Sequence, residues 1–264
     1  MRRAVLAAWA AAGLLLVSAC ATPTAGSDPS PASSPHDPGS PTVVGLGDSV
    51  MGGTNCGCSG IMSLYAEQEH AASPSTRIVP VNLGVPGATT STLRSDLQSS
   101  SVLSQVARAR VVVVIIGAND LIPQLRRWQR SGCSESCYAP AVTAMGERLH
   151  SVLGSVAAAR RSSTGAVLVL DYWNVFRDGE QTRQSQGQEI IDWARTVSRL
   201  ANSTICRASR DFHDTCVDLY GPMLGTDDDP SDLLAADGDH PNAKGVDLIV
   251  DRLVAATPRA VFGG

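Results

Sequence analysis

The feature that most constrains the fold is an unbroken apolar run at residues 111–116, VVVVII, near the middle of the chain. A strand with apolar side chains on both faces needs cover on both sides, as a parallel strand between two layers of helices has. Shorter runs rich in apolar residues occur at 43–46, 78–83, 166–170 and 216–219. The sequence therefore predicts five strands, with residues 111–116 in the middle of the sheet.

Stretches with helical patterning separate these runs. They cover residues 61–68, 91–99, 139–161 and 188–209, and a closing helix is expected from its cap Asn242 to residue 256. Strands that alternate with helices are joined by right-handed crossovers. The pattern predicts a three-layer, doubly wound α/β domain around a flavodoxin-like, mainly parallel sheet of five strands. We find no internal repeat, and residues 42–264 are expected to form one domain.

The first 19 residues have the pattern of a secretory signal peptide. Arg2 and Arg3 precede an apolar run at residues 4–17, which is shorter than the roughly 20 residues that span a bilayer. The run ends in VSAC, which resembles the bacterial lipobox, so Cys20 is expected to carry a lipid. Ordinary cleavage, with Cys20 an incidental thiol, is the alternative. Either pattern predicts export, to the outer face of the cytoplasmic membrane or beyond it.

Residues 20–41 are rich in Pro, Ser, Gly, Asp and Thr. A segment with so few apolar side chains cannot offset the entropy of its own ordering, so it is expected to be a disordered tether. The sequence thus predicts membrane contact only through the N-terminal lipid. His36 lies in this segment and is expected to be solvated.

Charge and composition exclude some classes of partner. The chain is 43% hydrophobic and 17% charged, which is typical of a globular protein, and its net charge is −4. Without a basic excess it has no electrostatic means of binding nucleic acid. We expect a monomer that acts on a small molecule, a lipid or a glycan.

Six cysteines besides Cys20 indicate disulfides, because their number is even and the chain carries an export signal. They allow 15 pairings. Proximity along the chain favours Cys133 with Cys137 and Cys206 with Cys216, which leaves Cys56 with Cys58. A metal site is the alternative, but these spacings match no common zinc pattern, so no metal is expected.

Three strand ends carry residues that could take part in catalysis or binding. Ser49 follows the first strand, Gly84 ends the second, and Asn119 follows the third. Ligands of open α/β sheets bind beyond the carboxyl ends of the strands, so these residues are expected near one site. Each has an ordinary alternative in turn or helix-cap chemistry. Asp237 and His240 lie in an Asp-rich loop, for which a solvated loop or a weak calcium site is the alternative.

Four sequence blocks occur in a fixed order: GLGDSV at 45–50, NLGVPGATT at 82–90, IIGAND at 115–120 and DGDHPN at 237–242. Together they resemble the conserved blocks of the SGNH (GDSL) hydrolases, over residues 46–242. The resemblance implies the SGNH hydrolase fold and a serine esterase. Ser49, Gly84, Asn119 and His240 match the four block residues, and Asp237 matches the family's Asp-x-x-His. Val50 replaces the leucine of the name motif.

The resemblance implies a role for each matched residue. Ser49 is the expected nucleophile, His240 the general base that takes its proton, and Asp237 the acceptor that orients the imidazole. The backbone N–H groups of Ser49 and Gly84 and the side-chain amide of Asn119 are the expected oxyanion donors. Such an enzyme works through an acyl-enzyme and needs no cofactor.

Several points stay open at the level of sequence. The substrate is a carboxylic ester, and a carbohydrate or cell-wall O-acetyl ester is one alternative; a non-catalytic glycan-binding lipoprotein on the same scaffold is another. Trp128, placed in a loop after Asn119, and Trp173, Asn174 and Phe176 are expected to line an acyl or alcohol pocket or to belong to the core. Asp48 is expected to fix its loop. His70, His150 and His213 are expected to be structural or exposed.

Overall fold

The computed structural model describes residues 39–161, 163–174, 176–225 and 227–262, and the structural statements below concern these residues. The expected signal peptide, Cys20 and most of the expected tether lie outside them. Within the described ranges, no helix is both long and apolar enough to cross a membrane.

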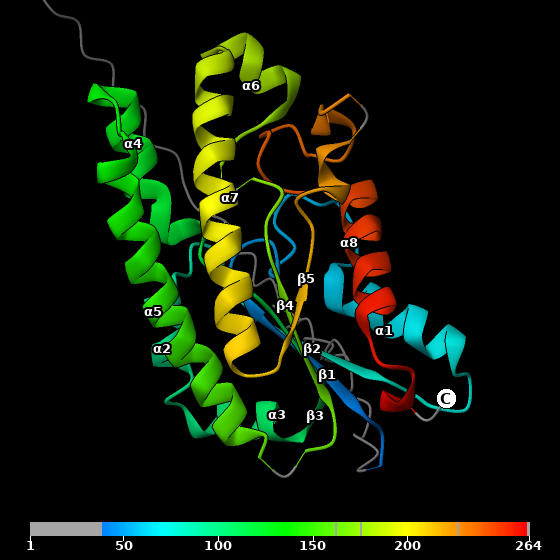
Figure 1. Cartoon of the computed structure of the whole chain (residues 1–264). Helices are drawn as coiled ribbons and strands as arrows, with labels where there is room; N and C mark the ends of the chain where they lie inside the picture. Colours follow the sequence, from blue (N-terminus) through cyan, green and yellow to red (C-terminus); the bar gives the residue numbers. More distant parts are fainter. Residues whose placement is uncertain (1–38, 162, 175, 226, 263–264) are drawn as a thin grey trace, which may run out of the picture. The chain divides into compact units, whose positions relative to one another are not determined.

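A sheet of five parallel strands forms the centre of the domain (Figure 1). The strands lie in the order β2-β1-β3-β4-β5. Their bounds are β1 Thr42–Gly47, β2 Val79–Gly84, β3 Ala109–Ile115, β4 Ala166–Leu170 and β5 Thr215–Val217. This is the order of flavodoxin-like folds, so the predicted fold class is confirmed. The central position of β3 is confirmed as well.

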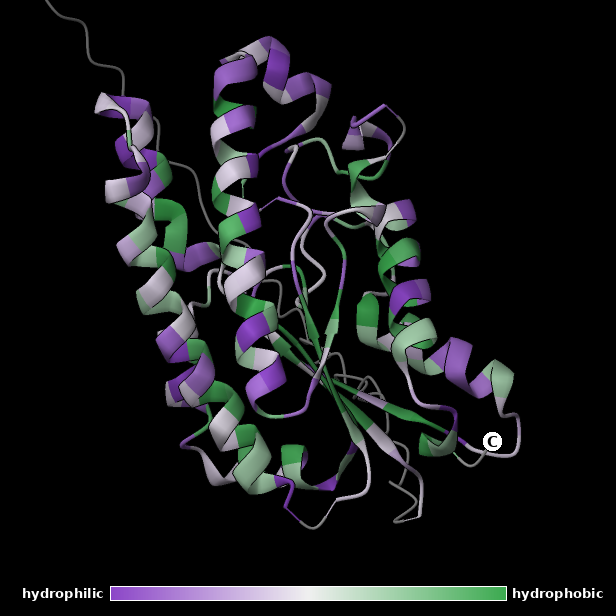
Figure 2. Cartoon of the chain, viewed as in Figure 1, coloured by the Kyte–Doolittle hydropathy of each residue, from purple (hydrophilic) through white to green (hydrophobic). Residues whose placement is uncertain are grey.

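Helices cover both faces of the sheet. Helices α1 (Ile61–Ala72) and α8 (Ala243–Ala256) contact each other on one face. The other face carries α2 (Thr90–Asp96), α3 (Ser100–Arg108), α5 (Glu135–Ala159) and α7 (Gln188–Asp211), of which α2, α3 and α7 all contact α5. Figures 1 and 2 show these two layers, with hydrophobic strands between them. The strands are therefore buried on both sides, as residues 111–116 require.

The closing helix shows how local sequence positions an element. The side chain of Asn242 accepts a hydrogen bond from the N–H of Gly245 and so caps α8, as expected. Val246, Ile249, Val250 and Leu253 are buried on one face of the helix. Burial of this apolar stripe fixes the end of the loop that precedes α8, and that loop carries Asp237 and His240.

Two helices escaped the sequence analysis, α4 (Ile122–Ser131) and α6 (Gly179–Gln186). Helix α6 buries only Gly179 and Thr182 and has no apolar stripe, whereas α4 is short and only partly buries its apolar residues Ile122, Leu125 and Trp128. The prediction of a loop at Trp128 is therefore wrong, because this residue lies in α4. The expected helix over 91–99 is instead α2 followed by α3, and α5 begins four residues earlier than predicted, at Glu135.

Three disulfides join neighbouring cysteines. They are Cys56–Cys58, Cys133–Cys137 and Cys206–Cys216, which is the pairing that proximity favours. The described residues contain no group of three or more His, Cys, Asp or Glu side chains that could hold a metal ion.

Candidate active site

Ser49 lies in a tight turn at the carboxyl end of β1. The N–H of Asp48 donates to the carbonyl of Ile115 at 3.2 Å, and the N–H of Gly52 donates to the carbonyl of Asp48 at 2.9 Å. A side chain at Gly47 would place its Cβ 2.2 Å from the Ile115 oxygen, so only glycine fits where β1 meets β3. The turn therefore presents Ser49, which is partly exposed, at the edge of the sheet.

Asp48 holds this turn from within, as the sequence analysis expected. Its carboxylate accepts the N–H of Val50 at 3.0 Å and the hydroxyl of Tyr172 at 2.5 Å. Burial raises the pKa of Asp48 to about 6, although both hydrogen bonds act to lower it. The side chain is 1% exposed, so it cannot itself reach a substrate.

The structure brings Ser49, Asp237 and His240 into one hydrogen-bonded series. His240 Nε2 lies 2.8 Å from Ser49 Oγ, and His240 Nδ1 lies 2.7 Å from Asp237 Oδ2. The other oxygen of Asp237 accepts the backbone N–H groups of Asp239 and His240, each at 3.0 Å. The loop thus folds around the Asp237 carboxylate and directs the imidazole toward Ser49, 191 residues away in the chain.

The ionisation state of Asp237 determines which ring nitrogen of His240 carries the hydrogen. Burial alone would raise its pKa, but hydrogen bonds from the Asp239 N–H, the Asn55 side chain and His240 lower that pKa to about 2. The carboxylate is therefore ionised and accepts a hydrogen bond from the Nδ1–H of His240. This assigns Nε2 as the acceptor for the Ser49 hydroxyl.

Asn55 is a site residue that the sequence analysis missed. Its side-chain amide donates to Asp237 Oδ2 at 2.6 Å. The residue has a φ of 59°, a left-handed conformation that asparagine tolerates, and it directly precedes the Cys56–Cys58 disulfide. Its contact spans 182 residues, so no local pattern could reveal it.

Asn119 lies in a short 3₁₀ turn, η1 (Ala118–Leu121), beyond the end of β3. One N–H of its amide donates to the carbonyl of Ala88 at 3.0 Å, which leaves the second N–H for a ligand. The next residue, Asp120, anchors the turn because it accepts the N–H of Thr90 at 2.8 Å and pairs with Arg148 at 2.8 Å. The amide is therefore held in place from two sides.

Ser49, Asn119 and His240 line one small cleft of about 30 Å³. Trp173 and Asn174 also line it, and both side chains are buried. Trp173 and Asn174 therefore line the pocket and also belong to the buried core, which were the two roles expected for them. Phe176 lines a neighbouring cavity instead, beside α4.

Gly84 differs from its expected role. Its N–H donates to the side-chain oxygen of Asn82 at 2.9 Å, and a Cβ at this position would lie 2.4 Å from the backbone nitrogen of Gly52. Gly84 therefore packs under the Ser49 turn, and its N–H is already engaged. It allows close approach between β2 and this turn, which explains why glycine is needed there.

Gly87, three residues later, lies in a tight turn and differs from Gly84 in its backbone contacts. The N–H of Ala88 bonds to the carbonyl of Val85 at 2.9 Å, and Gly87 has a φ of 80°, so Pro86 and Gly87 form the centre of a type II turn. Its N–H has no partner among the described residues, and open space surrounds its Cα. The Pro-Gly pair in the second block is the signal that could have pointed to it.

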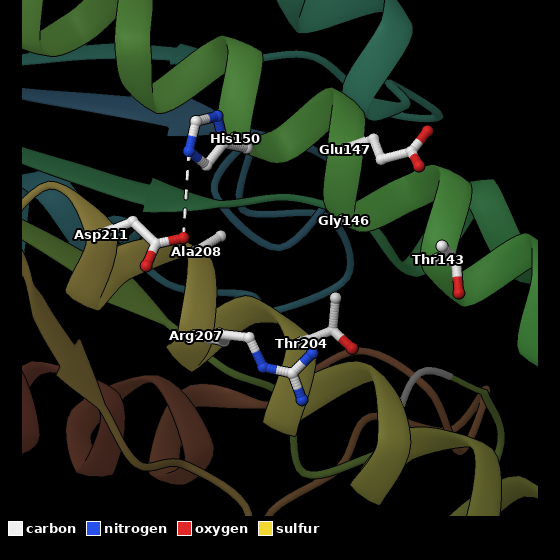
Figure 3. A pocket seen from close by; sticks show the side chains of 8 residues that line it. All are labelled: Thr143, Gly146, Glu147, His150, Thr204, Arg207, Ala208 and Asp211. Carbon is white, nitrogen blue, oxygen red and sulfur yellow. Dashed lines mark ion pairs between the residues drawn. The ribbon is translucent and has the colours of Figure 1, made fainter.

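A second histidine–aspartate pair lies between α5 and α7 (Figure 3). His150 Nε2 is 3.9 Å from Asp211 Oδ2, and the side chains are 55% and 54% exposed. His150 is therefore exposed, as expected. His70, also exposed, makes a hydrogen bond of 2.9 Å to the carbonyl of Thr76.

An all-parallel, helix-flanked sheet with a serine, an imidazole and a carboxylate at its carboxyl edge is an arrangement found in α/β serine hydrolases. The sequence comparison agrees with this class. Residues 46–248 match the GDSL-like Lipase/Acylhydrolase family, and this chain belongs to that family. Among curated proteins, no sequence matches it significantly.

Solved structures of lipases and esterases share the fold. A lipase from a goat rumen metagenome, Lip_vut3, has a TM-score of 0.66 and 18% identity, covering 84% of this chain and 100% of that chain. The psychrotrophic esterase EstA from Pseudoalteromonas sp. has a TM-score of 0.53 and 20% identity, over 81% and 95% of the two chains. The acetyl-xylooligosaccharide esterase Axe2 from Geobacillus has a TM-score of 0.59 and 16% identity, over 85% and 97%.

Proposed function

We propose that this protein is an exported serine esterase in which Ser49, His240 and Asp237 form the catalytic triad. The observation that carries the proposal is the pair of hydrogen bonds at His240, 2.8 Å to Ser49 Oγ and 2.7 Å to Asp237 Oδ2. A hydroxyl in contact with a base that is itself oriented by a carboxylate is the arrangement that activates a serine.

The reaction proceeds in two halves. Ser49 Oγ attacks the ester carbonyl while His240 Nε2 takes the hydroxyl proton, and the tetrahedral intermediate then expels the alcohol, which leaves with that proton. In the second half, His240 takes a proton from water, which attacks the acyl-serine. Collapse of the second intermediate returns the proton to Ser49 and releases the carboxylic acid.

The oxyanion is stabilised by donors that are already in place. We assign the N–H of Ser49, the second amide N–H of Asn119 and the N–H of Gly87 to this task. Gly87 takes the position first assigned to Gly84, whose N–H bonds to Asn82. Such donors aimed at the developing charge contribute about 10²- to 10³-fold each to turnover.

The second candidate function is a carbohydrate or cell-wall O-acetylesterase. Two observations favour a short acyl group: the cleft at Ser49 measures only about 30 Å³, and the structural neighbour from Geobacillus acts on acetyl-xylooligosaccharides. We further propose export through residues 1–19 and lipidation at Cys20, which rest on sequence alone.

Labelling with a fluorophosphonate probe, together with an ester panel, tests the proposal. We expect the probe to modify Ser49, and Ser49→Ala to lose both labelling and hydrolysis, by about 10⁴-fold or more, with an unchanged circular dichroism spectrum. A chain-length series of 4-nitrophenyl esters beside acetylated sugars then separates the two substrate classes. Residual hydrolysis above a few per cent in Ser49→Ala would reassign the nucleophile, and a wild type that is neither labelled nor active would indicate a binding protein.

A further inference from the structure

A second cavity adjoins the candidate catalytic cleft. It measures about 250 Å³, and Ile122 and Asp239 border both spaces. The cavity lies where α4, α6 and the segment after β4 meet, and Figure 1 shows α4 and α6 at the same end of the molecule. The two spaces therefore share part of their wall, and this cavity is the neighbouring space for a substituent on an ester bound at Ser49. We call this space the arginine pocket, after Arg126 and Arg177 in its wall.

The wall of the arginine pocket is mainly polar. Five of its nine lining residues are Arg126, Gln129, Arg177, Gln186 and Asp239. With two guanidinium groups and one carboxylate, the wall carries a net positive charge in a chain whose net charge is −4. Such a wall does not suit a long acyl chain, because apolar contact would separate these charges from water without giving them partners.

The two arginines are available to a ligand. Within the described ranges, neither Arg126 nor Arg177 makes an ion pair within 4.0 Å or a side-chain hydrogen bond, although the charge of Arg177 acts to lower the pKa of Asp239 in the same wall. Nearby arginines behave differently: Arg148 pairs with Asp120 at 2.8 Å and Arg195 with Asp178 at 2.9 Å. A guanidinium offers paired donors that match the two oxygens of a carboxylate or phosphate.

The frame of the pocket is rigid. Trp193 stacks on Phe176 with ring centroids 5.2 Å apart, contacts Trp128 of α4 at 5.8 Å, and donates to the carbonyl of Cys133 at 2.7 Å. Cys133 in turn is bonded to Cys137 directly after α4. A wall fixed before the ligand arrives loses little entropy when it binds.

Across the mouth of the frame, Gln129 of α4 donates to Gln186 of α6 at 3.3 Å. This contact links the two helices that the sequence analysis missed. Both helices contribute residues to the pocket wall, Arg126 and Gln129 from α4 and Gln186 from α6.

We infer that the arginine pocket binds an anionic group, a carboxylate or a phosphate, carried on the acyl or the alcohol part of the ester. The inference rests on the proposed function of Ser49 and adds the substrate class. A bidentate contact to Arg126 or Arg177 would hold the substrate while its ester carbonyl reaches Ser49.

Two pairs of esters test the inference. Mono-4-nitrophenyl adipate and its methyl ester differ in charge on the acyl side, and 4-acetoxybenzoate and its methyl ester differ on the alcohol side. We expect the wild type to favour the anionic member of at least one pair by about 10-fold in kcat/KM, in line with charge-assisted hydrogen bonds. The double variant Arg126→Gln/Arg177→Gln should lose this preference through KM, and neutral esters should stay within about twofold.

Arg127→Gln is the matched control, because Arg127 belongs to the same helix but does not line the pocket. An equal effect of Arg127→Gln, an equal loss on neutral esters, or an active enzyme without any preference for anionic esters would overturn the inference and leave the esterase intact. Calorimetric binding of 4-acetoxybenzoate to Ser49→Ala gives a readout without turnover, and there the two Arg→Gln changes should weaken binding about 10-fold. Hydrolysis that persists in Ser49→Ala would instead overturn the proposed function.

Discussion

His240 and His150 each have an aspartate oxygen near a ring nitrogen, and the two regions differ in everything else around that pair. His240 Nδ1 is 2.7 Å from Asp237, and its side chain is 15% exposed. His150 Nε2 is 3.9 Å from Asp211, which is beyond hydrogen-bond distance, and more than half of each side chain is exposed. The first pair is held by backbone and Asn55 donors, whereas the ring of His150 rests on Phe212 at 4.7 Å.

The hydroxyls beside the two histidines differ as well. Thr143 and Thr204 line the same pocket as His150, but their hydroxyls donate to carbonyls of their own helices, at 3.1 and 3.0 Å. Ser49 lies beyond a strand end, where its hydroxyl meets an imidazole instead. A histidine near an aspartate is thus not enough to mark a site. What distinguishes His240 is a neighbouring hydroxyl that is not bonded to its own backbone, and an orienting carboxylate that is held by several donors.

The largest expected effect separates the two histidines directly. His240→Ala should lower kcat/KM for 4-nitrophenyl esters by about 10⁴-fold or more, because Ser49 loses the base that accepts its proton. His150→Ala should leave kcat/KM within about twofold. Steady-state kinetics on both variants, with circular dichroism as a check of folding, measure this contrast. Comparable losses in the two variants would erase the distinction drawn between the two regions.

The second prediction concerns what holds the active pair in place. Asn55→Ala should lower kcat about 10-fold with little change in KM, because Asp237 loses a donor that keeps it ionised and oriented. The pH profile of kcat should shift at its acid end, while the melting temperature stays within about two degrees. An Asn55 variant with wild-type kinetics but lower stability would make this residue a loop support only.

The third prediction concerns stability rather than turnover. The pKa of Asp48 in the folded protein is about 6, above its ordinary value of 3.8. Between about pH 4 and pH 6 the folded state therefore binds more protons than the unfolded state. The stability that this group contributes is full at low pH and is lost as the pH rises through this range. The loss in the free energy of unfolding is on the order of 2 kcal/mol. Urea unfolding at pH 4 and pH 7 should show this loss, and Asp48→Asn should reduce it.

Asp211→Asn is the matched control for Asp48→Asn, because the Asp211 side chain is 54% exposed. It should leave the pH dependence of unfolding unchanged. If both substitutions alter that dependence equally, burial beside Ser49 is not the source of the effect at Asp48.

Much of the fold follows from sequence because periodic burial leaves a strong pattern. The run at 111–116 placed the central strand, and the apolar stripe of α7 gave a helix over 188–209 that the structure extends by two residues, to Asp211. The four blocks located Ser49, Asn119 and His240 at the sheet edge. Helices α4 and α6 are short, and neither fully buries an apolar side chain, so the pattern that they leave is weaker.

The contacts of Asn55 and Gly84 in the site could not be predicted from sequence patterns. Asn55 reaches Asp237 across 182 residues, and the N–H of Gly84 is taken by Asn82 two residues earlier. Such contacts depend on where backbones meet in space, and residue type alone does not encode that. The Pro86-Gly87 turn was visible in the sequence, but the left-handed φ of 80°, the unbonded N–H and the open space at Gly87 are features of the structure.

The 191 residues between Ser49 and His240 also impose an order of events on the growing chain. Every strand of the sheet precedes residue 240, whereas the imidazole is fixed only when α8 docks against α1 and β5. A polypeptide interrupted or clipped ahead of that step keeps its hydrophobic strands but has no base for its serine. In the proposed enzyme, Ser49 therefore gains its base only after α8 has docked.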